Sequence, residues 1–381
     1  MVEAVRTGAS KRAVARAFHV SLATVQWWLA RADGLGAEAV DWSDRSRRPG
    51  RLTRTRPDLE DLVIEVRTGL REQSVLGEYG AAAIRRELDA RGVGPLPSLR
   101  TIGRILERRG ALDARRRVRH RPPPPGWYLP RVAARSVELD SFDVIERIRL
   151  LGGQDLDVLT GVSLHGGLIG IWPEIGLTAT KTVAQLETHW RAVGLPGYVQ
   201  FDNDTRFIGG HGHPDSIGPV IRLCLALGVV PVFVPPRETG FQAAVEALNG
   251  RWERKVWARF WMPTLEATRA RSDAYVAESR RRHAVRIDAA PPRTPCSAEA
   301  PDLRRPPRGR LAFIRRTSDA GAISVLGRSY PVDPLWVHRL VRAELDLDRR
   351  RLQFFALRRA DPDAQPLLGE IEYVPPARWF R

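Results

Sequence analysis

The spacing of apolar residues divides the 381-residue chain into helical and strand-rich regions. Over residues 11–33 and again over 78–110, apolar residues recur every three or four positions, which is the period of an amphipathic helix. From residue 136 to about 263, short apolar runs alternate with helical periods, as in a mixed sheet flanked by helices. Beyond residue 311, short apolar runs separated by turn residues predict a set of small strands.

The first helical region has the pattern of a helix–turn–helix unit. Residues 11–18 and 22–31 are predicted helices joined at His19 and Val20, and Ser21 is a suitable N-cap for the second helix. The residues expected to face inward are Val25 and either Trp28 or Leu29. The side chains left for a DNA groove are Thr24, Gln26, Trp27 and Arg31. A helical hairpin packed for its own sake would show the same pattern.

The second helical region repeats this plan. Residues 81–90 and 99–109 are predicted helices on either side of a break rich in Gly and Pro, and Ser98 is the expected N-cap. The cations expected on the outer side are Arg100, Arg104, Arg108 and Arg109. Two such units in tandem favour DNA binding more strongly than either unit does alone.

Two basic segments flank the second helical region. Residues 44–51 form an extended segment suited to phosphates or a minor groove. Its candidate DNA contacts are Arg45, Arg47 and Arg48. Residues 115–121 are rich in arginine and lead into four prolines, so charge repulsion and proline together predict a linker. That linker either contacts DNA, which we favour, or stays solvated.

The predicted elements describe a multidomain chain with α, α/β and β parts. In the α/β part, the predicted strands are 136–144, 156–165, 168–173, 197–201 and 229–234, and the predicted helices are 182–193, 217–227 and 241–260. The last strands are predicted at 311–315, 322–326, 342–347, 351–357 and 370–374, and a small β-barrel is their expected arrangement. The expected domains are 1–43, 44–113, a linker at 114–135, the α/β part at 136–263, a helical and Pro/Arg-rich connector at 264–310, and the β part at 311–381.

The charge is unevenly distributed along the chain. The net charge is +17 overall, but residues 136–263 hold 11 Lys and Arg against 14 Asp and Glu. Residues 1–135 hold 27 Lys and Arg against 15 Asp and Glu, and the C-terminal part is also basic. Basic flanks around an acidic centre fit nucleic-acid binding around a metal site. A general bias toward Arg and Ala would explain the basic flanks but not the acidic centre.

Cysteine content and hydropathy exclude several protein classes. With only Cys224 and Cys296, the chain has neither a disulfide framework nor a four-cysteine zinc site. The N-terminus lacks the apolar region of a signal peptide, and the most apolar stretch, 220–234, is interrupted by Arg222 and Pro231. We therefore expect a cytoplasmic, nucleoid-associated protein that does not enter a membrane.

Three carboxylates stand where a metal site is expected. Asp140 and Asp202 each follow an apolar strand-like run, and Glu246 lies in a predicted helix. Hard cations such as Mg²⁺ take oxygen ligands, and carboxylates bridge the ions of two-metal sites, about 4 Å apart. Asp143 is the alternative to Asp140 as the first of these ligands.

The same residues carry a resemblance to a known family. Val137-Glu138-Leu139-Asp140 resembles the first motif of the retroviral-integrase-type catalytic core found in many insertion-sequence transposases. Phe201-Asp202-Asn203 resembles the second motif, and Glu246 with Asn249 three residues later resembles the third. Two helix–turn–helix units and a C-terminal barrel are also typical of these transposases, so the resemblance covers the whole chain in outline. Asp204 departs from the family, which usually has Gly there, and the spacing from Asp202 to Glu246 is longer than usual.

The resemblance implies an RNase H-like core of the DDE type. Asp140, Asp202 and Glu246 would then bind two Mg²⁺ or Mn²⁺ ions, with Asp140 preferred to Asp143 because the family motif places its Asp there. Asn249 would orient a ligand or contact DNA. Arg254 and Lys255 on the same helix would reach phosphates, or would simply form a solvated face.

The implied activity is cleavage at transposon ends and strand transfer into target DNA. The implied partners are double-stranded DNA, both end repeats and target, and further copies of the chain in a synaptic complex. Two alternatives remain open at this point. One is a catalytically inactive, transposase-derived DNA-binding protein, and the other is an RNase H-like nuclease that cuts without joining.

Overall fold

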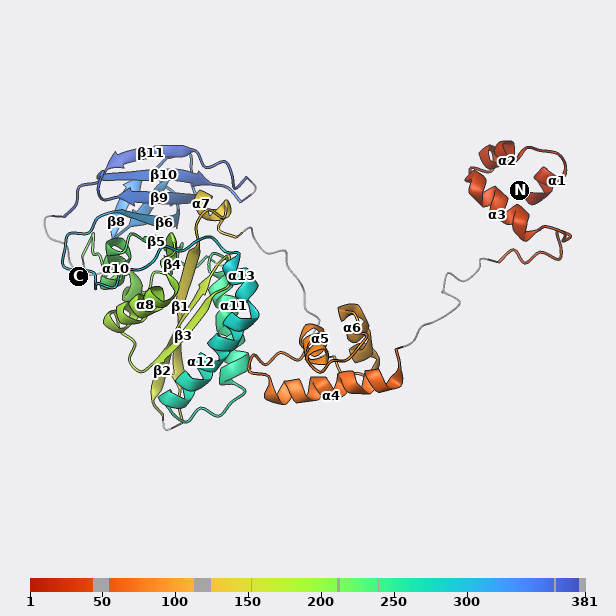
Figure 1. The fold of residues 1–381 in the computed structure, drawn as a ribbon. Coiled ribbons are helices and arrows are strands. Elements are labelled where there is room, and N and C mark those ends of the chain that lie inside the picture. The colour runs from red at the N-terminus through yellow and green to blue at the C-terminus, as the bar shows by residue number, and fades with distance from the viewer. Residues whose placement is uncertain are drawn as a thin grey trace. The chain divides into compact units, whose positions relative to one another are not determined.

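The computed structural model describes residues 1–43, 55–112, 125–151, 153–210, 213–238, 240–359 and 361–376. The chain divides into two compact units, Met1–Leu59 and Glu60–Arg381, which are coloured along the sequence in Figure 1. The predicted basic segment at 44–51, with Arg45, Arg47 and Arg48, lies outside the described residues, as does the arginine-rich run at 115–121.

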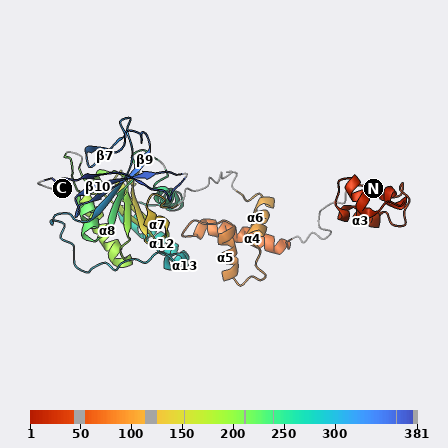
Figure 2. The ribbon, with the colours of Figure 1, turned by 90° about the horizontal axis from the view of Figure 1, so that it is seen from above.

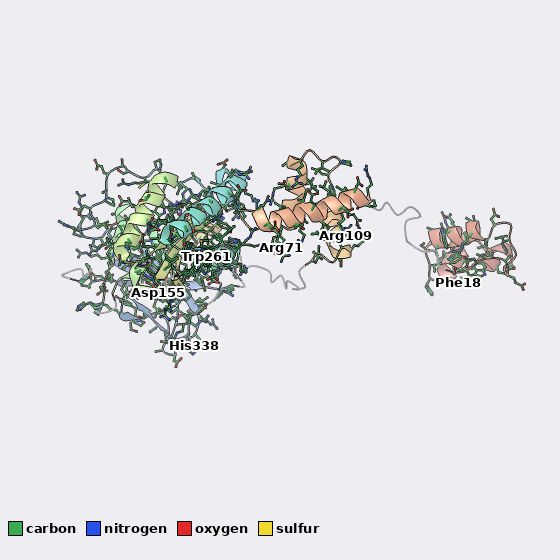
Figure 3. All side chains as sticks on the ribbon, turned by 90° about the horizontal axis from the view of Figure 1, so that it is seen from below. Phe18, Arg71, Arg109, Asp155, Trp261 and His338 are labelled. Carbon is green, nitrogen blue, oxygen red and sulfur yellow. The ribbon has the colours of Figure 1, made fainter. Side chains whose placement is uncertain are left out.

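The N-terminal unit is a bundle of three short helices. They are α1 (Val2–Arg6), α2 (Lys11–Ala17) and α3 (Leu22–Arg31). The hydroxyl of Ser21 accepts a hydrogen bond from the N–H of Thr24 at 3.0 Å, so the predicted N-cap is confirmed. Val25 is fully buried between α2 and α3. The side chain of Phe18, which follows α2, is about half exposed (Figure 3).

Three further helices follow the N-terminal bundle along the chain. They are α4 (Pro57–Gln73), α5 (Ala81–Ala90) and α6 (Leu99–Arg108). The last two confirm the predicted helices, and Ser98 accepts a hydrogen bond from the N–H of Thr101 as the expected cap. The sequence reading missed α4, whose Val63 and Val66 complete a core with the apolar faces of α5 and α6.

A sheet of nine strands forms the centre of the second unit. Its strands, in spatial order, are β11 (Leu367–Glu372), β10 (Arg351–Leu357), β9 (Leu340–Asp346), β6 (Arg310–Arg316), β5 (Val230–Phe233), β4 (Tyr198–Phe201), β1 (Leu139–Arg149), β2 (Asp155–Ser163) and β3 (Ile169–Glu174). β1, β4, β5 and β6 are mutually parallel neighbours, and the outer pairs are antiparallel. A separate hairpin consists of β7 (Ala322–Val325) and β8 (Arg328–Pro331).

The prediction of a separate C-terminal β-barrel is wrong. The strands are present, but β6 pairs in parallel with β5, with Val232 opposite Ala312 and Phe233 opposite Phe313. The rings of Phe233 and Phe313 stack with their centroids 5.5 Å apart. Residues 311–315 are buried without alternation, which is typical of a central parallel strand covered on both faces. The last strands therefore extend the central sheet.

Helices cover both faces of this sheet. α8 (Ala179–Val193) and α10 (Pro219–Ala226) pack on one face. α11 (Ala243–Trp252), continued by a π-helical turn (Glu253–Trp257), and α12 (Leu265–Arg282) pack on the other. α8 and α12 lie on different sides of the strands in both views (Figure 1 and Figure 2).

Three further helices are short, and one of them corrects the predicted linker. They are α7 (Pro130–Ala133), α9 (Thr205–Ile208) and α13 (Ala284–Asp288). The predicted linker at 114–135 is wrong for its last part, because Trp127, Tyr128 and Val132 are buried in a core that includes Phe241. Among the described residues, no helix combines the length and the apolar character that crossing a membrane requires.

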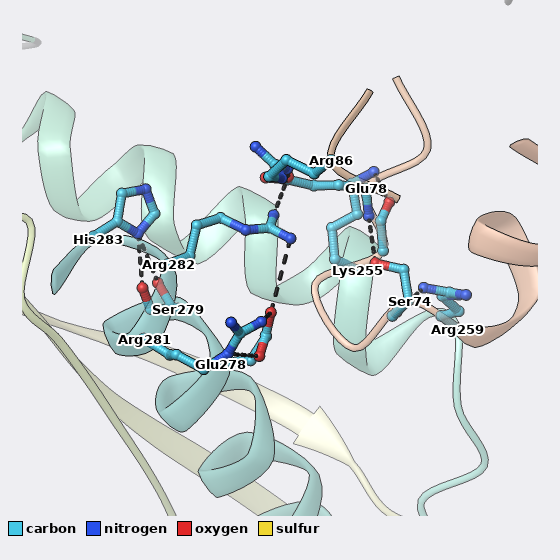
Figure 4. A network of polar contacts seen from close by, with 11 residues as sticks. Ser74, Glu78, Arg86, Lys255, Arg259, Glu278, Ser279, Arg281, Arg282 and His283 are labelled. Atoms are coloured by element: carbon cyan, nitrogen blue, oxygen red, sulfur yellow. Dashed lines mark hydrogen bonds and ion pairs between the residues drawn. The ribbon is translucent and has the colours of Figure 1, made fainter. Parts of the chain in front are cut away.

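The loop between α4 and α5 fastens the three-helix part to the sheet part (Figure 4). Leu76 is buried in the same core cluster as Trp252 and Met262. Lys255 donates from Nζ to the carbonyl oxygen of Gly77 at 2.6 Å. Gly77 has φ +61°, and a Cβ there would lie 2.8 Å from Cδ of Lys255, so only glycine fits.

Further polar contacts surround this buried contact. Arg259 donates to the carbonyl oxygen of Ser74 at 2.6 Å. Glu78 accepts from Arg86 of α5 at 3.0 Å and from Arg282 of α12, so one carboxylate joins two parts of the chain. These exposed pairs contribute little by themselves, and the apolar burial of Leu76 supplies most of the stabilisation.

We expect Leu76→Ala to loosen the three-helix part, because it removes a buried side chain at a cost of about 2–5 kcal/mol. Hydrogen exchange should rise in residues 74–79 and 253–257. Val75→Ala is the matched control, since its side chain is 43% exposed. Equal exchange in the two variants would contradict this account of the contact.

We expect Phe313→Ala to destabilise the whole sheet part by about 3–5 kcal/mol, since it opens a cavity beside Phe233. Urea unfolding followed by circular dichroism and by tryptophan fluorescence should give one coincident transition at lower urea. Leu367→Ala, at an exposed position of the edge strand β11, should change little. Two separate transitions would indicate that the last strands fold as a domain of their own.

Candidate functional site

Acidic side chains gather at one edge of the parallel strands. β1 pairs with β4, and Ser141 lies opposite Gln200 in this pair. The same register, extended by two residues, places Asp143 beside Asp202. Glu246 lies in the first turn of α11, which packs over β1 and β2. Asp204 follows β4 closely and completes the group.

The charges of these acids act on one another. Burial, together with the negative charges of Asp143 and Asp204, raises the pKa of Asp202 to about 6. Burial likewise raises the pKa of Asp143, and Glu246 and Asp204 add to this effect. Asp143 and Asp202 have no cationic partner at salt-bridge distance in the part of the chain that the structure describes.

Asp143 is held by a neutral network. Nδ2 of Asn249 donates to Oδ2 of Asp143 at 2.8 Å. The hydroxyl of Thr160, opposite Asp143 on β2, donates to Oδ1 of Asn249 at 2.6 Å and thereby fixes which end of the amide faces the carboxylate. Asn249 therefore orients Asp143, and the alternative of a DNA contact by this side chain is not supported. The sequence reading had no role for Thr160.

The structure does not bring Asp140, the predicted first metal ligand, together with Asp202 and Glu246. Side chains alternate between the faces of a strand, so residues three apart lie on opposite faces. Asp140 is buried against α8, where it accepts from Nη1 of Arg293 at 3.0 Å and from Nε1 of Trp190 at 3.2 Å. Asp143, the alternative weighed from the sequence, occupies the position beside Asp202.

Asp204 has its charge balanced locally. Arg206 donates to Asp204 from Nε at 2.9 Å and from Nη2 at 2.6 Å, and also pairs with Glu146. Burial raises the pKa of Asp204, but these hydrogen bonds from Arg206 outweigh it and hold the pKa below the usual value. The residue that departs from the family pattern thus caps α9, and Arg206 offsets part of the charge that it adds beside Asp202.

The carboxylates at this edge are of the kind that binds a hard divalent cation, although they do not lie close enough together to form a metal site in this structure. No group of three His, Cys, Asp or Glu side chains among the described residues lies close enough to hold a metal ion. Asp143, Asp202 and Glu246 nevertheless supply only oxygen donors, which Mg²⁺ and Mn²⁺ prefer. The raised pKa values of the two aspartates show that a positive charge at this edge would be favoured.

Two cations expected to contact DNA are engaged elsewhere. The side chain of Arg31 is only 8% exposed, lies over the rings of Trp27 and Trp28, and donates to Asp41 at 3.0 Å. Lys255 is bonded to Gly77 in the loop contact described above. Each cation therefore supports the fold in this structure, and the two DNA contacts stay predictions.

Other predicted contacts remain accessible. Those at exposed positions are Gln26, Arg100, Arg104, Arg108 and Arg254. Arg108 pairs with Glu60 across the three-helix part, and its neighbour Arg109 pairs with Asp61. Thr24 is partly exposed and its hydroxyl lies 2.8 Å from that of Ser21, so it belongs to the helix cap.

Comparison with models of protein families found no match, and comparison with curated proteins found none either. Among solved structures, one similar chain is from a simian T-cell lymphotropic virus intasome in complex with PP2A regulatory subunit B56 gamma. It shares 13% identity at a TM-score of 0.30, over 50% of this chain and 63% of that chain, which is less than two thirds of its length.

Two other similar structures are integrase catalytic cores. The HTLV-2 integrase core in complex with magnesium, in its dimeric form, shares 13% identity at a TM-score of 0.27, over 37% of this chain and 83% of that chain. The BIV integrase core shares 20% identity at a TM-score of 0.28, over 36% of this chain and 81% of that chain. Because all these TM-scores are below 0.5, the assignment of a function depends on the site itself.

The pKa of Asp202 predicts how stability depends on pH in metal-free buffer. Its folded pKa of about 6 lies above the ordinary value of 3.8, so the folded state binds the proton more tightly than the unfolded state. Stability should fall as pH rises from about 4 to 6, and the loss should be complete above pH 6. Asp202→Asn should reduce this slope and stabilise the protein at pH 7.5 by about 1–2 kcal/mol, since the carboxylate is partly exposed and screened.

Urea unfolding at pH 4.5, 6 and 7.5 measures the effect. Asp155→Asn is a control on the exposed start of β2 and should leave the pH slope unchanged. An Asp202→Asn variant with the slope of the unmodified protein would contradict the proposed burial of this charge.

Proposed function

We propose that the protein is a divalent-metal-dependent polynucleotidyl transferase of the DDE transposase and integrase type. The observation that carries this proposal is the meeting of Asp143, Asp202 and Glu246 at one edge of the sheet. Asp143 lies on β1 and Asp202 follows β4, its parallel neighbour, and neither carboxylate has a cationic partner at salt-bridge distance among the residues that the structure describes. Such an arrangement favours a bound cation and a phosphate substrate over an internal ion pair.

Asp143, Asp202 and Glu246 are the residues that would hold Mg²⁺ or Mn²⁺. Two such ions, when bound, would activate a water or a DNA 3′-hydroxyl and neutralise the charge that develops on the leaving oxygen. Asn249 and Thr160 hold the Asp143 carboxylate in one orientation, which is the usual task of groups around a metal ligand. Glu246 is exposed on α11, so its side chain is free to swing toward the two aspartates.

We further propose that the substrate is double-stranded DNA. The chain carries a net charge of +17, and α6 presents Arg100 and Arg104 to solvent. Exposed arginines on a helix suit phosphate contacts, and the exposed Gln26 of α3 suits a base edge. Two transposon ends must be joined in one complex, so we propose that the active form is an oligomer of this chain.

A second candidate is a DNA-binding protein that has lost catalysis. The observation that favours it is that Asp143, Asp202 and Glu246 do not already lie together as a metal site among the described residues. Metal binding separates the two candidates, because an active protein should gain stability from Mg²⁺ and an inactive one should not.

The test uses duplex DNA that carries the inverted repeats flanking the gene. Asp143→Asn, Asp202→Asn and Glu246→Gln should each lower Mg²⁺-dependent cleavage and strand transfer by more than about 100-fold. Asn249→Ala should lower them by about 10- to 100-fold, as expected for a residue that orients a ligand. Thermal unfolding with and without Mg²⁺ should show a metal-dependent gain in melting temperature that Asp202→Asn abolishes.

Asp140→Asn is the matched control on the same strand. It should lower the melting temperature, because Arg293 loses its buried partner, while the folded fraction keeps its activity. Loss of activity in Asp140→Asn at full stability, with activity retained in Asp143→Asn, would overturn the assignment of the first ligand.

A further inference from the structure

A cavity of about 450 Å³ lies directly beside the acidic edge. Its walls include Asn203, which follows Asp202, together with Arg315 and Arg316 from β6 and the turn at Leu326 and Gly327. β4, β5 and β6 run parallel, so the residues at their carboxyl ends share one edge of the sheet. The cavity therefore adjoins the acid site and is built in part by the strands that extend the sheet.

Arg315 places an unbalanced positive charge in the wall of this cavity. Its side chain is buried and donates from Nε to the carbonyl oxygen of Ser324 at 3.1 Å and from Nη1 to that of Val234 at 3.0 Å. All its acceptors are neutral, and no carboxylate in the described chain lies within salt-bridge distance of it. Burial lowers its pKa to about 10, so the guanidinium stays charged at neutral pH.

One donor of Arg315 remains available. Nη2 makes a single hydrogen bond, to Oδ1 of Asn203 at 2.8 Å, which leaves its second N–H without an acceptor among the residues that the structure describes. A buried cation ordinarily has an anionic partner, because desolvating a charge is costly. A bound anion would therefore supply the partner that Arg315 lacks among the described residues.

Asn203 connects this cation to the acid site. Its Nδ2 donates to the carbonyl oxygen of Val234 at 2.8 Å, while its Oδ1 accepts from Arg315. The amide is thus fixed on both sides, and the backbone continues from it directly into Asp202. A ligand bound at Arg315 would lie next to any group bound at the carboxylates.

We propose that the cavity binds a phosphodiester group of the DNA strand that enters the acid site, one or more nucleotides away from the reacting phosphate. This inference rests on the proposed function and adds a site at which the DNA substrate is held. A cavity of this size admits one nucleotide, and Arg316 at the rim, paired with Glu238, adds a second cation. Arginine suits phosphate because its planar fork donates two parallel hydrogen bonds.

The experiment uses the full chain and a fluorescein-labelled single strand of ten thymidines in buffer containing EDTA. Fluorescence anisotropy measures affinity over a range of salt, and hydrogen exchange measures protection of residues 322–327. Arg316→Gln should weaken binding several-fold and reduce the salt slope by about one. Arg315→Met should abolish the protection of residues 322–327, and Arg315→Lys should restore part of it.

Arg310→Gln is the matched control, since it removes an exposed cation from the other end of β6 and lies outside the cavity. It should leave the protection of residues 322–327 unchanged. If Arg315→Met fails to fold, Arg316→Gln decides the question, because its side chain lies at the surface. Unchanged affinity and salt slope in Arg316→Gln, or no protection of residues 322–327 at saturating oligonucleotide, would overturn the proposal.

A control with inorganic phosphate tells whether the cavity binds a phosphodiester group of DNA or a free phosphate ion. Protection of residues 322–327 by millimolar phosphate, with none from the oligonucleotide, would identify a site for free phosphate and overturn the proposal. Failure of the proposed function would appear differently. The unmodified protein would then show no cleavage, while oligonucleotide binding would still depend on Arg315 and Arg316. Loss of that dependence with cleavage intact would overturn the cavity assignment alone.

Discussion

The parallel alignment of β1, β4, β5 and β6 is the constraint on which the functional edge depends. Parallel strands end on the same side of a sheet, so residues that follow them in sequence are brought together without any further device. Asp143 and Asp202 meet because β1 and β4 share a register. Arg315 reaches Asn203 because β6 continues the same parallel set, held to β5 by the stacked rings of Phe233 and Phe313. The C-terminal strands therefore belong to the site as well as to the core.

The two faces of β1 treat a carboxylate in opposite ways. Toward α8, Asp140 is paired with the guanidinium of Arg293, so its charge is neutralised within the fold. Toward α11, Asp143 is held by the neutral amide of Asn249, which fixes the carboxylate without cancelling its charge. Asp143 therefore keeps a negative charge that a bound cation would stabilise, whereas the charge of Asp140 is already neutralised. This difference gives Asp140 a structural partner and leaves Asp143 as the carboxylate of β1 that we propose as a ligand.

Much of the fold follows from local patterns, whereas the site required the arrangement of the strands. The N-caps at Ser21 and Ser98 and most strands were predictable, since caps and apolar periods are short-range signals. Asp140 was preferred because the motif ends there, but which face a residue occupies depends on the register of β1 with β2 and α11. The apolar residues at 311–314 predict a strand, and only the pairing of that strand with β5 distinguishes an extended sheet from a barrel.

The net charge of the chain overstates the positive charge that is available to an external anion. Several arginines are used internally as donors to backbone carbonyls, as when Arg280 of α12 bonds the carbonyl oxygen of Ile169 at 2.9 Å. Arg31 and Lys255 are similarly engaged, although their helical positions suggested a DNA-facing surface. A cation that satisfies a buried carbonyl cannot leave it for a phosphate without exposing an unpaired polar group. The cations available to an external anion are therefore those that lack an internal acceptor, such as the second Nη2 N–H of Arg315 among the described residues, and they are far fewer than the total of +17 suggests.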